Sequence, residues 1–86
     1  MRSVEIEINN TEGLHARPAS RLVGLCHQFG SSIMISTQEA AADGKNITEV
    51  LSLGAEKGNT LTIKIDGKDE VGAEKAIKDF FKTGAE

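Results

Sequence analysis

Apolar and polar residues alternate in three stretches of this 86-residue chain. An alternation of period two predicts a strand with one face buried and the other in water. The three predicted strands cover residues 3–8, 32–36 and 60–65. Their expected buried positions are Val4, Ile6, Ile8, Ile33, Ile35, Leu61, Ile63 and Ile65. The 60–65 stretch has the clearest strand pattern of the three.

The period changes to that of a helix between the first two strands. Apolar residues recur there at intervals of three and four, the stripe of an amphipathic helix. They are Ala19, Leu22, Val23 and Cys26. Pro18 supports a helix start at Ala16, because proline is tolerated in the first turn of a helix and breaks it later. Phe29-Gly30 is predicted to end the helix, with Gly30 at the position after the C-cap.

Two further helices are predicted in the second half of the chain. Asn46 followed three residues later by Glu49 is typical of a helix start, and Gly54 ends this short helix. Asp69, which follows an Asp66-Gly67 turn, is the expected N-cap of the last helix. The apolar faces are Ile47, Val50 and Leu51 on the short helix and Ala73, Ala76, Ile77, Phe80 and Phe81 on the last.

Residues 38–44 have the least regular pattern. Their three alanines are compatible with a helix, a short edge strand or a loop, and we favour a strand over 40–42. The element order is then β-α-β-β-α-β-α. Because every sheet face and helix stripe needs a partner, this order predicts an α+β open-faced sandwich with the helices packed on one face of one sheet. The length fits a single domain over residues 1–86.

Composition narrows the classes of function. The net charge is −3, and the chain has no Trp or Tyr and three Phe, so it lacks the basic, aromatic-rich surface of nucleic-acid-binding proteins. The sequence has no apolar run of about eighteen residues, so we expect no membrane insertion. It also shows no secretory signal sequence, so we expect a cytoplasmic protein. Cys26 is the one cysteine. It cannot form an internal disulfide, and its place in the helix stripe predicts a small core residue.

The chemistry of the chain is concentrated in residues 13–19, Gly-Leu-His-Ala-Arg-Pro-Ala. This segment places His15 at the expected helix start, where unpaired backbone N–H groups and the helix dipole favour an anion. Arg17 adds a guanidinium that can hold phosphate oxygens through paired hydrogen bonds. A neutral His15 ring has a nitrogen lone pair for nucleophilic attack. The segment therefore predicts a phosphoryl site with a nucleophile beside it.

Each residue of this segment also has a simpler interpretation. A histidine at a helix start is often a cap or a solvated residue, and an exposed arginine is often only a surface charge. Gly13 could simply turn the chain, or it could let a ligand approach the backbone. His27 does not suggest a shared metal site, since twelve helical residues separate it from His15 by roughly 18 Å. We expect no metal and no cofactor.

The 13–19 segment resembles the active-site signature of the HPr family, the histidine phosphocarriers of the bacterial phosphoenolpyruvate-dependent phosphotransferase system. The resemblance covers essentially the whole chain. The length, the position of the histidine motif, the apolar segment 47–53 followed by Gly54, and the last strand and helix all fall where that family has them. It implies that the sheet is antiparallel, with four strands and with three helices on one face.

The resemblance implies a relay and not a stand-alone enzyme. His15 would receive a phosphoryl group on its Nδ1 atom from phosphorylated enzyme I and pass it to enzyme IIA. Arg17 matches the family's arginine that interacts with the phosphoryl group, and the backbone N–H groups of Ala16 and Arg17 would help to hold it. A carrier that meets successive partners through one face is most simply a monomer.

The resemblance also implies a partner-binding surface beside the histidine. By position it comprises Ser20, Arg21, Ile47, Thr48 and Leu51. Ile47 and Leu51 could instead be core residues. Thr48 stands where a large apolar residue is common, which predicts an altered partner affinity. Asn46 stands where some members carry a serine that an ATP-dependent kinase phosphorylates, so we do not expect that modification at this position.

Two classes of function follow from these residues. The first is a phosphotransfer intermediate that serves sugar uptake or a related regulatory branch. The second is a regulatory binding module in which the phosphorylation state of His15 controls partner proteins. An unrelated small-ligand-binding α+β domain is a third. The presence of both His15 and Arg17 favours the phosphotransfer intermediate.

Overall fold

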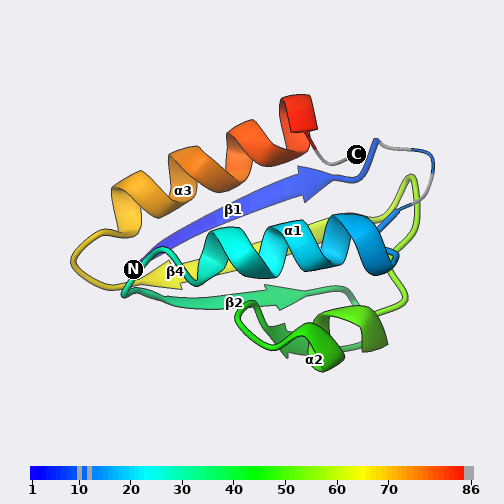
Figure 1. The fold of residues 1–86 in the computed structure, drawn as a ribbon, viewed down its shortest axis with the longest axis horizontal. Coiled ribbons are helices and arrows are strands. Elements are labelled where there is room, and N and C mark those ends of the chain that lie inside the picture. Colours follow the sequence, from blue (N-terminus) through cyan, green and yellow to red (C-terminus); the bar gives the residue numbers. More distant parts are fainter. Residues whose placement is uncertain (10, 12, 85–86) are drawn as a thin grey trace.

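The computed structural model describes residues 1–9, 11 and 13–84. Four antiparallel strands form one sheet in the order β1-β4-β2-β3, and three helices lie against it (Figure 1). The strands are β1 (Arg2–Glu7), β2 (Ser32–Ser36), β3 (Ala41–Asp43) and β4 (Thr60–Asp66). The helices are α1 (Ala16–Cys26), α2 (Ile47–Ser52) and α3 (Glu70–Asp79), with a π-helical segment over Phe80–Gly84 after α3. The predicted α+β sandwich is confirmed.

The register of the sheet explains the alternating pattern of the strands. Ile63 of β4 pairs with Val4 of β1 on one side and with Ile35 of β2 on the other, so one row of apolar side chains crosses three strands. Cross-strand neighbours of this kind pack on the same face of a sheet. β4 is flanked on both sides, and its inward residues Leu61, Ile63 and Ile65 are fully buried.

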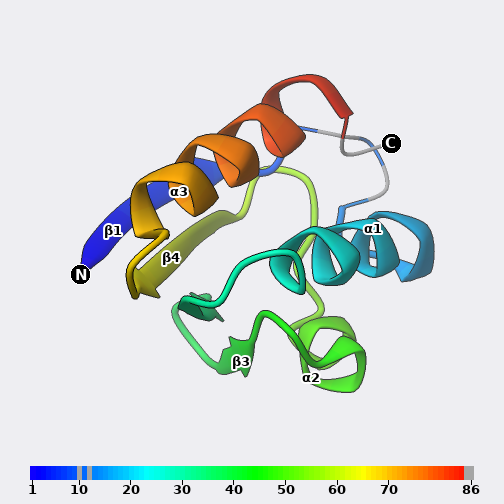
Figure 2. The ribbon, with the colours of Figure 1, turned by 60° about the vertical axis from the view of Figure 1, so that its left-hand side comes forward.

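All three helices cover the same face of the sheet (Figure 2). The core lies between them and the inward strand residues, and the predicted stripe of α1 is buried in it. The opposite face is open to solvent and carries side chains such as Glu5, Met34 and Lys64. No helix in the described part of the chain has the length and apolar character needed to cross a bilayer.

Several predicted boundaries are corrected by the structure. α1 ends at Cys26 and not at Phe29-Gly30. After Cys26 the hydrogen bonds no longer follow the α-helical pattern, because the Gln28 and Phe29 N–H groups donate to the carbonyls three residues earlier. The edge strand predicted over 40–42 exists, but it covers Ala41–Asp43. The first strand ends at Glu7, although Ile8 beyond it is fully buried as predicted. Of the polar loop expected over 9–13, positions 10 and 12 lie outside the described residues.

The cap of α2 is confirmed. The Asn46 side chain accepts a hydrogen bond from the Glu49 N–H at 3.1 Å, which satisfies one of the donors of the first turn. Gly54 follows the helix with φ +60°, a left-handed conformation that favours glycine. Glu49 does not complete a reciprocal capping box, since its carboxylate accepts from the Asp43 N–H instead.

Asp69 lies at the N-cap position of α3 as predicted, but its side chain makes no cap. Its carboxylate accepts hydrogen bonds from the N–H groups of Gly30 and Ser31, at 2.9 and 3.0 Å, and from the Ser31 hydroxyl. The hydrogen bonds from the Ser31 hydroxyl and the Gly30 N–H stabilise the charged carboxylate, and they are the main reason that the pKa of Asp69 is lowered. Asp69 thus ties the β4–α3 turn to the α1–β2 turn.

Candidate functional site

His15 is the N-cap residue of α1. Its backbone is extended, with φ −82° and ψ −171°, and its side chain makes no capping hydrogen bond. The ring is exposed. The Ala19 N–H donates to the His15 carbonyl at 2.9 Å, and Pro18 has no N–H at all. The N–H groups of Ala16 and Arg17 therefore have no carbonyl partner within the helix.

The charge around this helix start is positive. Arg17 is exposed in the first turn, and that turn contains no acidic residue. Among the described residues, Arg17 makes no ion pair. The guanidinium, the helix dipole and the first N–H groups all favour an anion at this position. An anion attached to the His15 ring would meet all three.

A tight turn over residues 55–59 holds the backbone that leads to His15. The Leu14 N–H donates to the Ala55 carbonyl at 3.0 Å. At the other end of the turn, the Ile8 N–H donates to the Asn59 carbonyl and the Gly58 N–H donates to the Ile8 carbonyl, both at 2.9 Å. Figure 1 shows this turn, the end of β1 and the start of α1 at the same end of the sheet.

Gly13 is required by this arrangement. Its φ is +65°, and a Cβ atom on it would stand 2.6 Å from the Ala55 carbonyl oxygen and 2.8 Å from the Glu56 Cα atom. The space above Gly13 is therefore occupied by the 55–59 turn and not left for a ligand. Sequence reasoning missed this turn as part of the site, and its only local signal is the Gly58-Asn59 pair, a common turn dipeptide.

A surface formed by α1 and α2 carries the residues expected to bind partners. We call this surface the α1–α2 face; it comprises Ser20, Arg21, Ile47, Thr48 and Leu51, all of which are exposed. Ile47 and Leu51 are 38% and 40% exposed, so the alternative that they are core residues is wrong. Val50 supplies the buried side of α2. α1 and α2 lie side by side (Figures 1 and 2).

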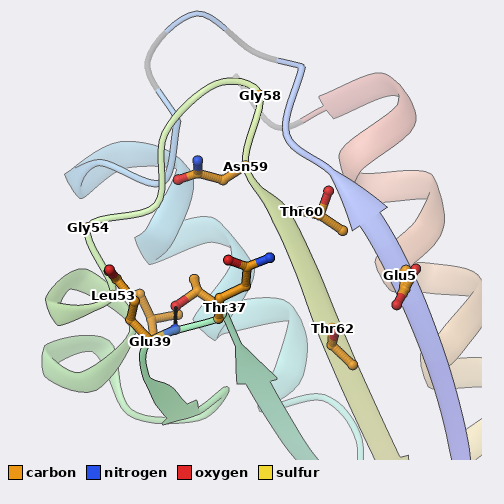
Figure 3. A pocket seen from close by; sticks show the side chains of 10 residues that line it. Glu5, Thr37, Glu39, Leu53, Gly54, Gly58, Asn59, Thr60 and Thr62 are labelled. Atoms are coloured by element: carbon orange, nitrogen blue, oxygen red, sulfur yellow. Dashed lines mark hydrogen bonds between the residues drawn. The ribbon is translucent and has the colours of Figure 1, made fainter.

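A cavity of about 630 Å³ lies on the open side of the sheet, away from the α1–α2 face. Figure 3 shows it between the 37–39 turn, the 53–59 segment and the outer side of β4. Its lining includes the carboxylates of Glu5 and Glu39 and no lysine or arginine. Such a lining repels a phosphoryl anion. Among the described residues, the exposed start of α1 is therefore the candidate anion site.

The remaining histidine and the cysteine serve the fold. The His27 ring nitrogen Nε2 lies 2.9 Å from the Lys45 carbonyl oxygen, and the Lys45 ammonium donates to the Phe29 carbonyl at 2.8 Å. These contacts tie the end of α1 to the turn before α2. Cys26 is fully buried as predicted, and burial raises the pKa of its thiol to about 11. Within the described residues, no three metal-ligating side chains gather.

Comparison with known proteins points to one family. A family model described as the PTS HPr component phosphorylation site matches residues 2–83. The phosphocarrier protein HPr of Lysinibacillus sphaericus is 36% identical over 77 residues, which cover 90% of this chain and 88% of that protein. The multiphosphoryl transfer protein of Salmonella typhimurium is 36% identical over 95% of this chain, which spans only 23% of that longer protein.

The fold gives the same result. The crystal structure of HPr-C-His from Thermoanaerobacter tengcongensis superimposes with a TM-score of 0.94 at 36% sequence identity. The match covers 99% of this chain and 96% of the other. The arrangement of one sheet and three helices is thus shared over the full length described here.

Proposed function

The chain belongs to the HPr family of phosphocarriers of the phosphotransferase system, and we propose that His15 accepts a phosphoryl group from phosphorylated enzyme I and passes it to enzyme IIA. The observation that carries this proposal is the position of His15. Its ring is exposed and makes no capping bond, and it stands at the N-terminus of α1 beside Arg17.

The helix start favours Nδ1 as the phosphorylated atom. Nδ1 is the ring nitrogen nearer to the main chain, and an N-cap side chain places its nearer polar atom close to the first N–H groups of the helix. In the transfer, the Nδ1 lone pair forms a bond to phosphorus while the bond from phosphorus to the donor nitrogen breaks and leaves its electron pair on the donor. The Ala16 and Arg17 N–H groups and the Arg17 guanidinium then stabilise the phosphoryl oxygens.

The modest strength of this site suits a carrier. Tight binding of the phosphoryl group would stabilise the loaded state and slow the next transfer. One exposed arginine and one helix terminus supply a limited stabilisation, and both are open to an incoming partner. We therefore propose that His15 is loaded and unloaded by other proteins and that the chain is not a catalyst by itself.

The α1–α2 face is the proposed docking surface for both partners. It joins exposed apolar side chains, Ile47 and Leu51, to the positive charge of Arg21 and the adjacent Arg17. Aromatic or aliphatic side chains surrounded by acidic residues on a partner would complement it. Use of one face by donor and acceptor in turn is compatible with a monomer in the cytoplasm, which is the state we propose.

The direct test is phosphorylation by phosphoenolpyruvate and catalytic enzyme I, followed by intact-mass measurement. We expect one acid-labile phosphoryl group on the wild type and none on His15→Ala. Arg17→Ala is expected to slow both loading and transfer on the order of tenfold or more, since a charge-assisted contact to the phosphoryl group is lost.

The outcomes separate the two classes of function. A wild-type protein that takes no acid-labile phosphate would contradict the carrier function. A labelled protein that transfers nothing to any enzyme IIA would instead support the regulatory binding module.

A further inference from the structure

We propose that Asn59 is a positioning residue for His15, which deepens the proposed function and rests on it. Asn59 lies directly before β4, on the rim of the cavity on the open side of the sheet (Figure 3). It is far along the chain from His15, and nothing in its local sequence connects the two. The connection is made through the 55–59 turn.

Asn59 closes this turn with two hydrogen bonds to one residue. Its Oδ1 atom accepts from the Glu56 N–H at 2.8 Å, and its own N–H donates to the Glu56 carbonyl at 2.9 Å. A side chain that accepts from a backbone N–H nearby fixes the turn as an additional backbone bond would. The Asn59 side chain therefore sets the conformation of residues 55–59.

The same turn holds both ends of the segment that leads from β1 to α1. The Asn59 carbonyl accepts from the Ile8 N–H at the end of β1, and the Ala55 carbonyl accepts from the Leu14 N–H directly before His15. Gly13 packs against Ala55 and Glu56 with no room for a Cβ atom. A change in the turn therefore moves Leu14, and with it the backbone of His15.

His15 depends on this support because its own side chain contributes none. It makes no capping hydrogen bond, so the direction of its ring follows from its extended backbone and from the position of Leu14, which is 2% exposed. Phosphoryl transfer needs the attacking nitrogen in line with the donor, and small misplacements of reacting groups slow reactions strongly. Asn59 acts on this geometry without touching the phosphoryl group.

The test compares Asn59→Ala, Asn59→Asp and Thr37→Ala. The alanine variant loses the acceptor for the Glu56 N–H, whereas Asn59→Asp keeps an oxygen at that place. Thr37→Ala is the matched control, since its hydroxyl accepts from the Glu39 and Ala40 N–H groups at 3.2 Å in another turn that lines the same cavity. Among the described residues, that turn makes no hydrogen bond to the segment before His15.

We expect single-turnover loading by phosphorylated enzyme I to be slower in Asn59→Ala, on the order of tenfold at saturating donor. The concentration of donor that gives half the maximal rate should stay unchanged, because Asn59 is not on the α1–α2 face. Asn59→Asp and Thr37→Ala should load within about twofold of the wild type. Equal loading rates in Asn59→Ala and the wild type would overturn the proposal.

A second readout does not depend on phosphorylation. Amide hydrogen exchange of Leu14 should be faster in Asn59→Ala than in the wild type, relative to Ile63 in the middle of β4, which is paired on both sides and reports global unfolding. Asn59→Asp and Thr37→Ala should leave this ratio unchanged. If Asn59→Ala does not fold, Asn59→Leu, which is similar in size and has no acceptor, must show the same two effects.

These measurements distinguish the two proposals. A wild-type protein that is never phosphorylated contradicts the proposed function, and the exchange of Leu14 still reports whether Asn59 holds the segment. A phosphorylated wild type with unchanged Leu14 exchange in Asn59→Ala contradicts the role of Asn59 alone.

Discussion

At the scale of single residues, the candidate phosphoryl site depends on a glycine whose role the motif alone does not reveal. Gly13 combines a left-handed backbone with a contact to the Ala55 carbonyl that excludes a Cβ atom. Both features follow from the 55–59 turn, which is about forty residues away in sequence. A local pattern can therefore mark Gly13 as part of a motif, but it cannot show which atoms of the distant turn need the space that a Cβ atom on Gly13 would fill.

Gly13→Ala is expected to destabilise the fold by about 2 kcal/mol or more, since both the strained φ and the overlap with backbone atoms oppose it. Gly24→Ala is the matched control. Gly24 is exposed within α1 and a Cβ atom there meets nothing within 4 Å, so this change should stabilise by about 0.5 to 1 kcal/mol. Urea unfolding of both variants measures the difference. Equal effects of the two alanines would refute the account of Gly13.

At the scale of the elements, the alternating and helical patterns were sufficient to predict the three longer strands and the two longer helices, with the side that each of them buries. The edge strand in residues 38–44 has no such pattern and was only favoured over a helix or a loop. These patterns succeed because side chains return to the same face of a strand every second residue and to the same side of a helix every three or four residues. The row of side chains across β1, β4 and β2 is an example. The end of α1 was predicted wrongly because the hydrogen bonds after Cys26 change to a spacing of three residues, a change that the apolar stripe does not mark.

The same distinction applies to the candidate site. His15 was placed correctly at the start of α1, since Pro18 and the apolar stripe mark that start locally. The exposure of Ile47 and Leu51 was left open, because a short amphipathic helix does not by itself show how much of each side its neighbours cover. The support from the 55–59 turn was missed, since hydrogen bonds between distant backbone segments leave no trace in residue type.

The Asp69 connection predicts a dependence of stability on pH. The pKa of Asp69 is lowered in the folded state, chiefly by the hydrogen bonds from Ser31 and Gly30, from its usual 3.8. A lowered pKa means that the folded state binds the proton less readily than the unfolded chain does. The stabilisation of the fold by the Asp69 carboxylate is therefore complete above about pH 4, and it is lost as the pH falls through the pKa that Asp69 has in the folded state. The pKa values of Glu70 and Glu74 are lowered as well.

We expect Asp69→Asn to be less stable than the wild type at pH 7, with the gap narrowing towards pH 3. Urea unfolding of both proteins at the two pH values measures it. Asp66→Asn serves as the control, since this exposed carboxylate has only a 3.6 Å ion pair with the terminal amine. A gap that stays constant or widens in acid would show that the Asp69 carboxylate does not stabilise the fold through these bonds.

At the scale of the whole molecule, the two sides of α2 face different surroundings, with Val50 in the core and Leu51 on the α1–α2 face proposed for docking. Leu51→Ala is expected to raise the concentration of phosphorylated enzyme I or enzyme IIA needed for half-maximal transfer by roughly threefold to tenfold, with a stability change within about 0.5 kcal/mol. Val50→Ala should cost about 2 kcal/mol of stability, because a fully buried side chain is shortened, and should leave this concentration unchanged.

Steady-state transfer assays and urea unfolding of the two variants test this separation. A Leu51→Ala protein that is destabilised as much as Val50→Ala would show that Leu51 belongs to the core. Unchanged transfer at every partner concentration would remove the α1–α2 face from docking.

The order of the strands also governs when this protein can fold during its synthesis. β4 lies between β1 and β2 in the sheet but comes last of the four in the chain. Until residues 60–66 leave the ribosome, β1 has no strand to pair with, and the segment before His15 lacks the turn that holds it. When distant strands pair, the chain loses the entropy of loop closure before any stabilising contact between the strands forms. Between the emergence of residue 19 and that of residue 66, the nascent chain therefore carries the complete histidine motif without the turn and the sheet that hold it.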